Sequence, residues 1–189
     1  MRTIAMTLVA AATSTGALCL SAEEAHEHGV GRLNVALDGT ELQMELISPG
    51  ANIVGFERKP SGAEEENTVS QALTQLEDGN SLFELPDAAG CRLTTAEVET
   101  DLMEAETVHD DDEEHHEEED SGHDDHADEG HAEFHATYRF TCESPDALER
   151  LKVDLFDYFP GTEELLVQVI SPRGQTVHEV TASDREIGL

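Results

Sequence analysis

Residues 32–38 and 41–47 each alternate between apolar and polar side chains, a pattern that predicts two β-strands with one apolar face apiece. The Asp38-Gly39 pair between them favours a two-residue hairpin turn. That turn would pair Val35 with Leu42 and Leu33 with Met44, which places both apolar sets on one face of the hairpin. The alternating apolar residues are Leu33, Val35, Leu37, Leu42, Met44 and Leu46.

After the hairpin the apolar residues recur every three or four positions, which predicts one helix. Ser61 with Glu64 three residues later forms a capping-box pattern, and Pro60 precedes it. Asp78-Gly79 ends the helical pattern. The apolar residues at helical spacing are Val69, Ala72, Leu73 and Leu76.

Strand-like stretches resume after the helix. Many strands with one clear helix and short turns predict an α+β domain built on an antiparallel sheet. The length suits a single domain over 23–189 with one long insertion, a disordered loop rich in His, Asp and Glu at about 104–130. The predicted strands are 82–85, 91–103, 134–142, 151–156 and 165–170, with a weaker one at 176–181.

The first 22 residues have the features of a secretory signal peptide. Arg2 gives a positive start, residues 4–20 are apolar or small, and Ala22 offers a small residue at the cleavage position. A lipoprotein signal ending at Cys19 is the alternative, but bulky Leu18 precedes that cysteine, so we expect cleavage near Ala22. No later segment is long and apolar enough to span a membrane. We therefore expect a periplasmic mature chain.

The chain carries a formal charge of −33, which becomes −34 once the signal peptide and its Arg2 are removed. This charge excludes nucleic acid and anionic membrane surfaces as partners. The negative charge has two possible explanations, which the sequence leaves open. One is an acidic surface adapted to a salty exterior, and the other is a negative electrostatic potential that concentrates cations near the protein. Two cysteines remain, and outside the cytosol we expect them to form one disulfide, Cys91–Cys142, which closes a loop around the insertion.

Residues 104–135 hold seven histidines and sixteen Asp or Glu residues, with no Lys or Arg among them. Acidic runs alone are usually solvated and disordered, but such a linker needs no histidine. Imidazole nitrogen and carboxylate oxygen together suit Zn²⁺, and less selectively Ni²⁺, Cu²⁺ or Co²⁺. The insertion therefore predicts divalent-metal binding. Its candidate ligands are His109, His115, His116, His123 and His126.

Two short stretches add candidate ligands for one ordered metal site. In the strand after the insertion, His131, Glu133 and His135 share the face opposite the apolar residues, with successive Cβ atoms about 6.5–7 Å apart. Near the mature N-terminus, His26 and His28 point the same way if the chain is extended. We expect three or four of these histidines to form the ordered site, while the insertion provides weaker and exchangeable sites.

Four stretches outside the insertion carry a family resemblance, and they cover most of the mature chain. They are HEHGVGRLNVALDGTELQMELISPGANIVGFE at 26–57, AAGCRLT at 88–94, HAEFHATYRFTC at 131–142 and LFDYFPGTEELLVQVISPRGQ at 155–175. In them the chain resembles the ZrgA family of periplasmic, zinc-regulated proteins. The resemblance implies zinc binding and a role accessory to zinc uptake by an ABC importer, and it supports His26, His28 and His131 as ligands. Members often continue GFE with His, whereas Arg58 follows Glu57 here, so a ligand at that position is absent.

The expected function is capture of Zn²⁺ and its transfer to the periplasmic receptor of the importer. Carboxylates near imidazole attract cations and also favour its protonated form, so capture should weaken as the pH falls. One alternative is a general buffer or detoxification protein for Ni²⁺ or Cu²⁺, which metal excess rather than zinc starvation would induce. A calcium-binding module is a weaker alternative, because the run lacks EF-hand or RTX spacing. We do not expect an enzyme, because HExxH, GxSxG, phosphate-loop and deaminase motifs are absent.

Overall fold

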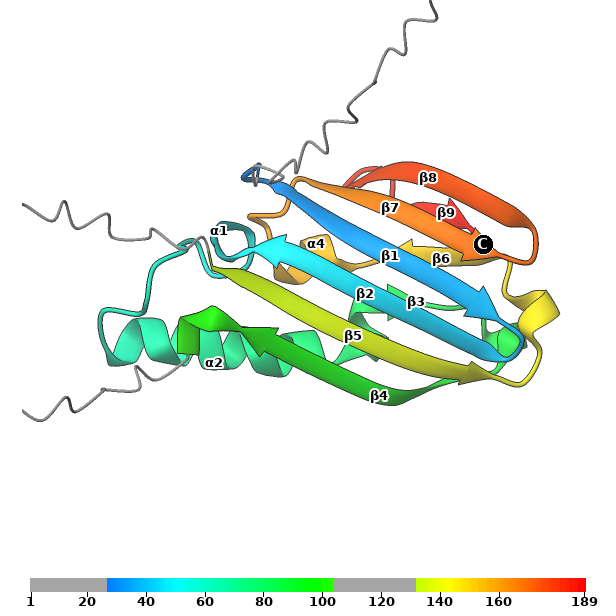
Figure 1. The fold of residues 1–189 in the computed structure, drawn as a ribbon, viewed down its shortest axis with the longest axis horizontal. Coiled ribbons are helices and arrows are strands. Elements are labelled where there is room, and N and C mark those ends of the chain that lie inside the picture. The colour runs from blue at the N-terminus through cyan, green and yellow to red at the C-terminus, as the bar shows by residue number, and fades with distance from the viewer. Residues whose placement is uncertain (1–26, 104–131) are drawn as a thin grey trace, which may run out of the picture.

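The computed structural model describes residues 27–103 and 132–189, which form two β-sheets joined by helices and turns (Figure 1). The larger sheet has the strand order β4-β5-β2-β1-β7-β8, and the smaller sheet has the order β3-β6-β9. The strands are β1 (Val30–Asp38), β2 (Glu41–Pro49), β3 (Phe83–Glu84), β4 (Cys91–Thr100), β5 (Glu133–Cys142), β6 (Arg150–Val153), β7 (Glu164–Ser171), β8 (Gly174–Thr181) and β9 (Glu186–Gly188). The α-helices are α1 (Gly50–Ile53), α2 (Ala63–Glu77), α3 (Gly79–Leu82) and α4 (Leu155–Tyr158), and the 3₁₀ turns are η1 (Asp87–Ala89), η2 (Asp101–Met103) and η3 (Pro145–Ala147).

The predicted α+β class is confirmed, because the described residues are mostly β-sheet and α2 is their one α-helix longer than four residues. The expectation of an antiparallel sheet holds for four of the five ladders of the larger sheet, and the β1–β7 ladder is parallel. Alternation of side chains defines the faces of a strand but not the direction of its neighbour. The short strand β9 was not predicted, and the stretch predicted as a strand over 151–156 turns into α4 after Val153.

The β1–β2 hairpin is confirmed, but its predicted register is wrong by two residues. Asp38 pairs with Glu41, so the turn consists of Gly39 and Thr40 rather than Asp38-Gly39. Gly39 has a φ of +58°, a conformation that glycine adopts readily, and this extends β1 through Asp38. The apolar pairs are Leu37–Leu42, Val35–Met44 and Leu33–Leu46, and they still share one face because the shift is an even number of residues.

Helix α2 begins later than predicted, and its capping box is wrong. The N-cap residue is Gly62, which makes no side-chain cap hydrogen bond. Ser61 instead donates its backbone N–H and its hydroxyl to Glu65 Oε2, at 2.7 Å and 2.9 Å. The predicted helical spacing is confirmed, since Val69, Ala72 and Leu76 are buried.

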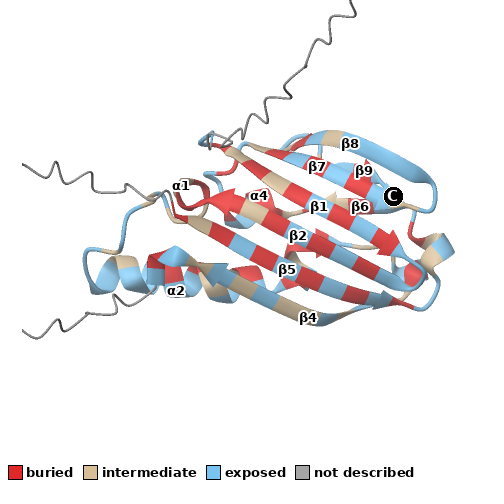
Figure 2. Ribbon diagram, viewed as in Figure 1, coloured by how far each residue is buried: buried red, intermediate tan, exposed pale blue. Residues whose placement is uncertain are grey.

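One face of the larger sheet carries the core, and the other faces solvent. Figure 2 shows buried and exposed residues alternating along its central strands. Tyr138 of β5 joins the layers on the inner face: its hydroxyl donates to the main-chain oxygen of Leu76 in α2 at 2.8 Å, and its ring meets Phe83 of β3 edge-on, with centroids 5.1 Å apart. The helix and the smaller sheet therefore both pack against the inner face, and the outer face is left open for polar residues.

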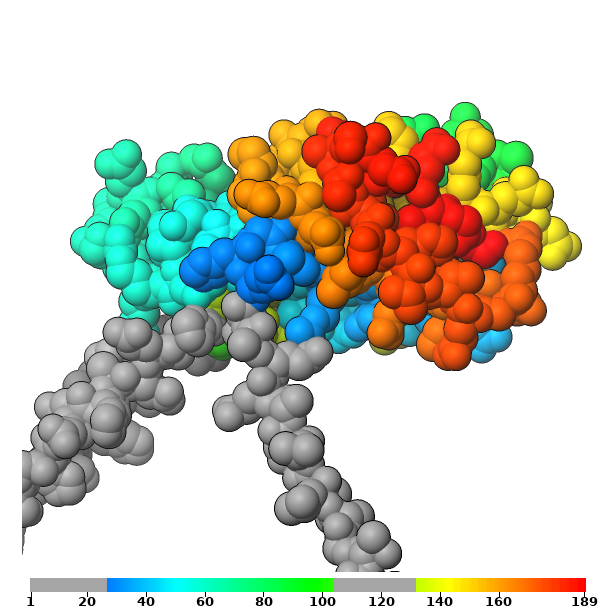
Figure 3. Space-filling view, turned by 90° about the horizontal axis from the view of Figure 1, so that it is seen from above, coloured from blue at the N-terminus to red at the C-terminus, as the bar shows by residue number. Residues whose placement is uncertain are grey.

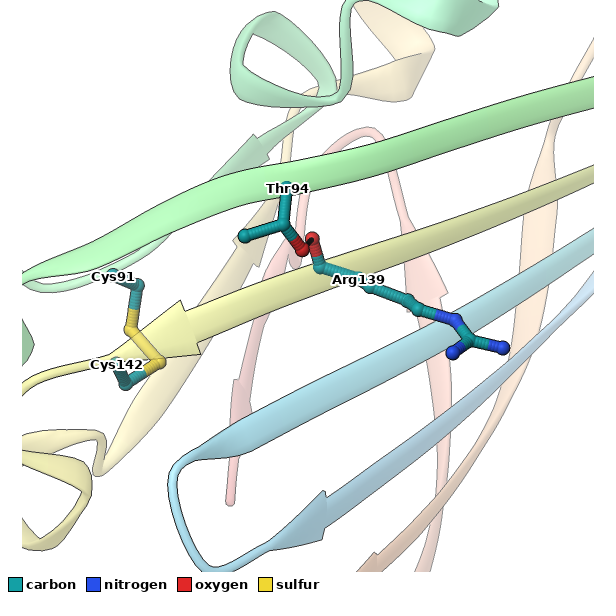
Figure 4. Close-up of a disulfide and its surroundings, with 4 residues drawn as sticks. All are labelled: Cys91, Thr94, Arg139 and Cys142. Carbon is teal, nitrogen blue, oxygen red and sulfur yellow. Dashed lines mark hydrogen bonds between the residues drawn. A yellow bond between two sulfur atoms is a disulfide. The ribbon is translucent and has the colours of Figure 1, made fainter.

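The predicted disulfide Cys91–Cys142 is confirmed, and it links directly opposite residues of β4 and β5 (Figure 4). Its sequence separation of 51 residues spans the insertion. In the chain-entropy account, closing a loop of this size stabilises the fold by about 4 kcal/mol. The bond lies where β4 begins and β5 ends. It therefore links the two strands that flank residues 104–131 in the sequence at the end of the ladder far from Thr100 and Phe134. Among the helices of the described residues, none is both long and apolar enough to cross a membrane.

Candidate metal site

Of the predicted metal ligands, the structure describes His28, Glu133 and His135. All three lie at the end of the larger sheet where β1 and β5 begin and where β2 and β4 finish, which we call the site end (left in Figure 1). The remaining predicted ligands fall outside the described residues. They are His26, His109, His115, His116, His123, His126 and His131.

His28 lies beside the carboxylate of Glu57, which was not among the predicted ligands. Its Nε2 lies 3.1 Å from Oε1 of Glu57, and the side chain of Glu57 is only 13 % exposed. Two donors of one tetrahedral zinc ion lie about 3.3 Å apart, given metal–ligand bonds of about 2.0–2.1 Å. The separation of these two atoms therefore suits joint binding of a metal ion as well as a direct contact. The one sequence feature that could have pointed to Glu57 is its place as the last residue of 26–57, the longest of the stretches that resemble the family.

Buried Asn52 holds the turn that presents His28. The Gly29 N–H donates to Asn52 Oδ1 at 2.7 Å, and Asn52 Nδ2 donates to the Val30 carbonyl at 3.1 Å and to Ser48 Oγ at 3.3 Å. The carbonyl of Gly29 in turn accepts from the backbone N–H groups of residues 163 and 164. Figure 3 shows this junction from outside, with the blue residues that open β1 between the cyan residues around α1 and the orange residues before β7. Because both backbone groups of Gly29 are fixed, the main chain next to His28 is fixed as well.

The chain segment with Glu57 is tied to the start of β5. The Ala132 N–H donates to the Glu57 carbonyl at 3.4 Å, and the Ala132 carbonyl accepts from the Gly50 N–H at 2.7 Å. Gly50 has to be glycine, because a Cβ there would lie 2.6 Å from the Phe56 carbonyl oxygen and 3.0 Å from that of Ala132. The starts of β1 and β5 therefore meet through the segment that follows β2. In the sequence, His26 and His131 are joined directly to Glu27 and Ala132, both at this end.

Arg58, which follows Glu57 in the chain, anchors the same segment to α2. Its guanidinium donates from Nη1 and Nη2 to the two carboxylate oxygens of Glu65, each at 2.7 Å, and lies 5.3 Å from the ring centroid of Phe56. The hydrogen bonds from Arg58 and from Ser61 lower the pKa of Glu65 to about 2. Arg58 therefore holds the chain segment next to Glu57 against α2.

The predicted outward face of β5 is confirmed for its described residues. Glu133 is half-buried, whereas His135, Thr137 and Arg139 are exposed. His135 Nε2 lies 3.3 Å from Glu133 Oε2, which matches the separation of about 3.3 Å between two donors around tetrahedral zinc. Glu133 also lines a pocket of about 110 Å³ together with Glu27, at the junction of β1, β2 and β5.

The site end therefore carries two imidazole–carboxylate pairs, His28–Glu57 and Glu133–His135, with Glu27 nearby. Within 27–103 and 132–189, no three His, Cys, Asp or Glu side chains already converge closely enough to hold a metal ion. Each pair offers two donors of the kinds that zinc prefers, so a complete coordination shell needs either a side-chain movement or donors from elsewhere. His178 lies away from these pairs, on the edge strand β8, where its Nε2 is 2.9 Å from Thr176 Oγ1.

A family model described as "ZrgA family zinc uptake protein" matches residues 25–189, which is nearly the whole chain after the predicted signal peptide. The match includes both imidazole–carboxylate pairs and the insertion. No curated protein matches the sequence.

Proposed function

This chain belongs to the ZrgA family of zinc uptake proteins, and from that premise we propose that it is a periplasmic zinc-binding protein that captures Zn²⁺ and supplies it to an ABC importer. We propose further that it acts by binding and not as an enzyme. The observation that supports this most directly is the presence of two imidazole–carboxylate pairs at the same end of the sheet. The periplasmic location rests on the signal-peptide pattern and agrees with a disulfide, which persists in oxidising compartments.

The donor set supports exchangeable binding. After removal of the signal peptide the chain has two cysteines, and both are in the disulfide, so neither supplies a thiolate. Nitrogen and oxygen donors on partly exposed side chains are left to hold the ion. Because a thiolate-free site of this kind releases zinc more readily than a closed Cys-rich site, it suits a protein that passes its ion onward.

Zinc titration of the mature chain tests which residues hold the tightest ion. A variant with His28→Ala and His135→Ala should lose that site, seen as at least a tenfold weaker affinity by competition with a zinc chelator. His178→Ala is the matched control, because it removes an imidazole from the same sheet away from the pairs, and it should bind zinc like the unaltered chain. Equal affinities for all three proteins would show that the described residues do not form the site.

Deleting residues 108–130 separates the insertion from the folded domain. The number of bound zinc ions should fall, because five histidines of the insertion are removed, while one tight ion per chain should remain. Loss of all tight binding would place the functional ligands in the insertion instead.

Transfer to the importer is tested with its purified, metal-free periplasmic receptor. Zinc-loaded protein should fill the receptor faster than the same total zinc held by a small chelator of equal affinity. If the rate matches that of the chelator, the protein acts only as a buffer and the transfer proposal fails.

A further inference from the structure

Strand β4 contains a β-bulge that decides which of its side chains face the solvent. Leu93 pairs with Phe140, but Thr95 pairs with Arg139, so Thr94 is the extra residue. The Thr94 hydroxyl donates to the Arg139 carbonyl at 2.9 Å, which fixes the bulge to β5 (Figure 4). A bulge shifts the register of everything that follows it by one residue and often re-aims side chains next to functional sites.

The register after the bulge brings two glutamates to the outer face. Glu97 pairs with Thr137 and Glu99 pairs with His135, and all four of these residues are exposed. An unshifted ladder would pair Val98 with His135 and turn Glu97 and Glu99 towards the core. The bulge thus keeps two carboxylates out of the core and sets one of them directly opposite a histidine.

We propose that Glu99 is a further ligand of the zinc site, acting with His135 and Glu133 on the outer face of β4 and β5. Directly opposite residues of an antiparallel ladder have Cβ atoms about 4.5–5.5 Å apart, so Glu99 reaches the same ion as His135. Glu133 Oε2 and His135 Nε2 are already 3.3 Å apart. The side chain of Glu99 is exposed, so it is able to change rotamer and present a third donor.

The three donors fit a site for capture rather than storage. One imidazole and two carboxylates leave at least one coordination position for water or for a donor from elsewhere in the chain. Such an open position on a solvent-exposed face allows an ion to enter and leave without any opening of the fold. This inference rests on the proposed function and adds one ligand and one location to it.

The test compares Glu99→Gln with Glu97→Gln in the full mature chain. Both substitutions remove one negative charge from the same face of the same strand, but only Glu99 lies opposite His135. The readout is the zinc concentration at which the imidazole proton signals of His135 shift in NMR spectra, with assignment by His135→Ala. The signals of His28 are followed in the same spectra.

Glu99→Gln should raise the zinc concentration needed to shift His135 about tenfold, as expected for loss of a carboxylate at a metal ion. Glu97→Gln should change it by less than twofold, and neither variant should change the response of His28. Equal effects of the two variants would mean that only the local negative potential matters, which overturns the assignment of Glu99. If His28 responds to zinc but His135 does not in the unaltered chain, the outer-face site is wrong while the proposed function stands. If neither histidine responds, the described zinc site as a whole is wrong.

Discussion

Replacing Asn52 with Ala tests whether one buried amide holds the part of the molecule that presents His28. Asn52 is 2 % exposed, and its side chain makes three hydrogen bonds. Alanine removes all three and leaves the Gly29 N–H, the Val30 carbonyl and the Ser48 hydroxyl without this partner. It changes no group at the His28–Glu57 contact itself.

The expected loss of stability follows from those three bonds. A neutral hydrogen bond contributes about 1 kcal/mol net, and a buried polar group left without a partner costs about 1–3 kcal/mol. Small shifts and entering water restore part of this, so we expect Asn52→Ala to lower the free energy of unfolding by about 3 kcal/mol. For a domain of this length, that corresponds to a melting temperature roughly 6–12 °C lower.

Urea unfolding of the metal-free mature protein measures this loss, and Thr162→Val is the matched control. Thr162 is likewise buried, at 3 % exposed, but its Oγ1 has no hydrogen-bond partner among the described residues. Valine at this position should leave stability unchanged or raise it by about 1 kcal/mol, since it removes a desolvated hydroxyl of nearly the same shape. Asn52→Ala should also weaken the zinc response of His28 about tenfold, the size of effect seen when an orienting partner of a ligand is lost. The reasoning is refuted if Asn52→Ala costs less than about 0.5 kcal/mol.

Three further substitutions test other parts of this arrangement. Gly50→Ala should destabilise the protein by about 1–3 kcal/mol in urea unfolding. The reason is that the new Cβ would lie 2.6 Å from the Phe56 carbonyl oxygen and 3.0 Å from that of Ala132. An unchanged urea midpoint would show that the backbone relaxes freely. Glu65→Gln should remove one acid-sensitive contribution to stability: the pKa of Glu65 is lowered from 4.5 to about 2, so its contribution is fully present above pH 4.5 and is lost as the pH falls towards 2. The stabilities of this variant and the unaltered chain should therefore converge over that range, and a constant difference would contradict the assignment. Tyr138→Phe should cost about 1–2 kcal/mol, because it leaves a buried main-chain carbonyl of α2 without its donor; thermal unfolding without loss would mean that water replaces the hydroxyl.

Much of the fold follows from side-chain periodicity alone. The alternation in β1, β2 and β5 identifies the core face of each strand, because a strand with one buried face has to repeat every two residues. Periodicity does not fix register, as the two-residue error at the hairpin shows, since any even shift keeps the same face buried. It also cannot reveal a parallel neighbour, because the partner of β1 on that side lies more than a hundred residues later in the chain.

The donor types of the candidate site and its Glu133–His135 pair were predictable from the sequence, but the pairing of His28 with Glu57 was not. The sequence singles out His28, Glu133 and His135, and the structure places all three at one end of the sheet. Glu57 and Glu99 were missed for different reasons. Glu57 meets His28 only because Asn52 and Gly50 fold the segment after β2 back against the start of β1, a tertiary contact without a local pattern. Glu99 lies opposite His135 because of one extra residue in the ladder, and a bulge without glycine leaves no turn signal in the sequence.

The disulfide and the site end lie at opposite ends of the same two strands, and this separation has a mechanical consequence. Cys142 and His135 are seven residues apart on β5, about 24 Å at ordinary strand rise. The disulfide links the first residue of β4 to the last residue of β5. From the bulge onward, the ladder between the two strands continues without interruption to Thr100, opposite Phe134. The described residues on either side of 104–131, Met103 and Ala132, thus lie next to a ladder that the disulfide secures at its other end, beside the imidazole–carboxylate pairs. We propose that histidines joined to the chain at this point act on zinc near the ordered ligands, at a high effective concentration.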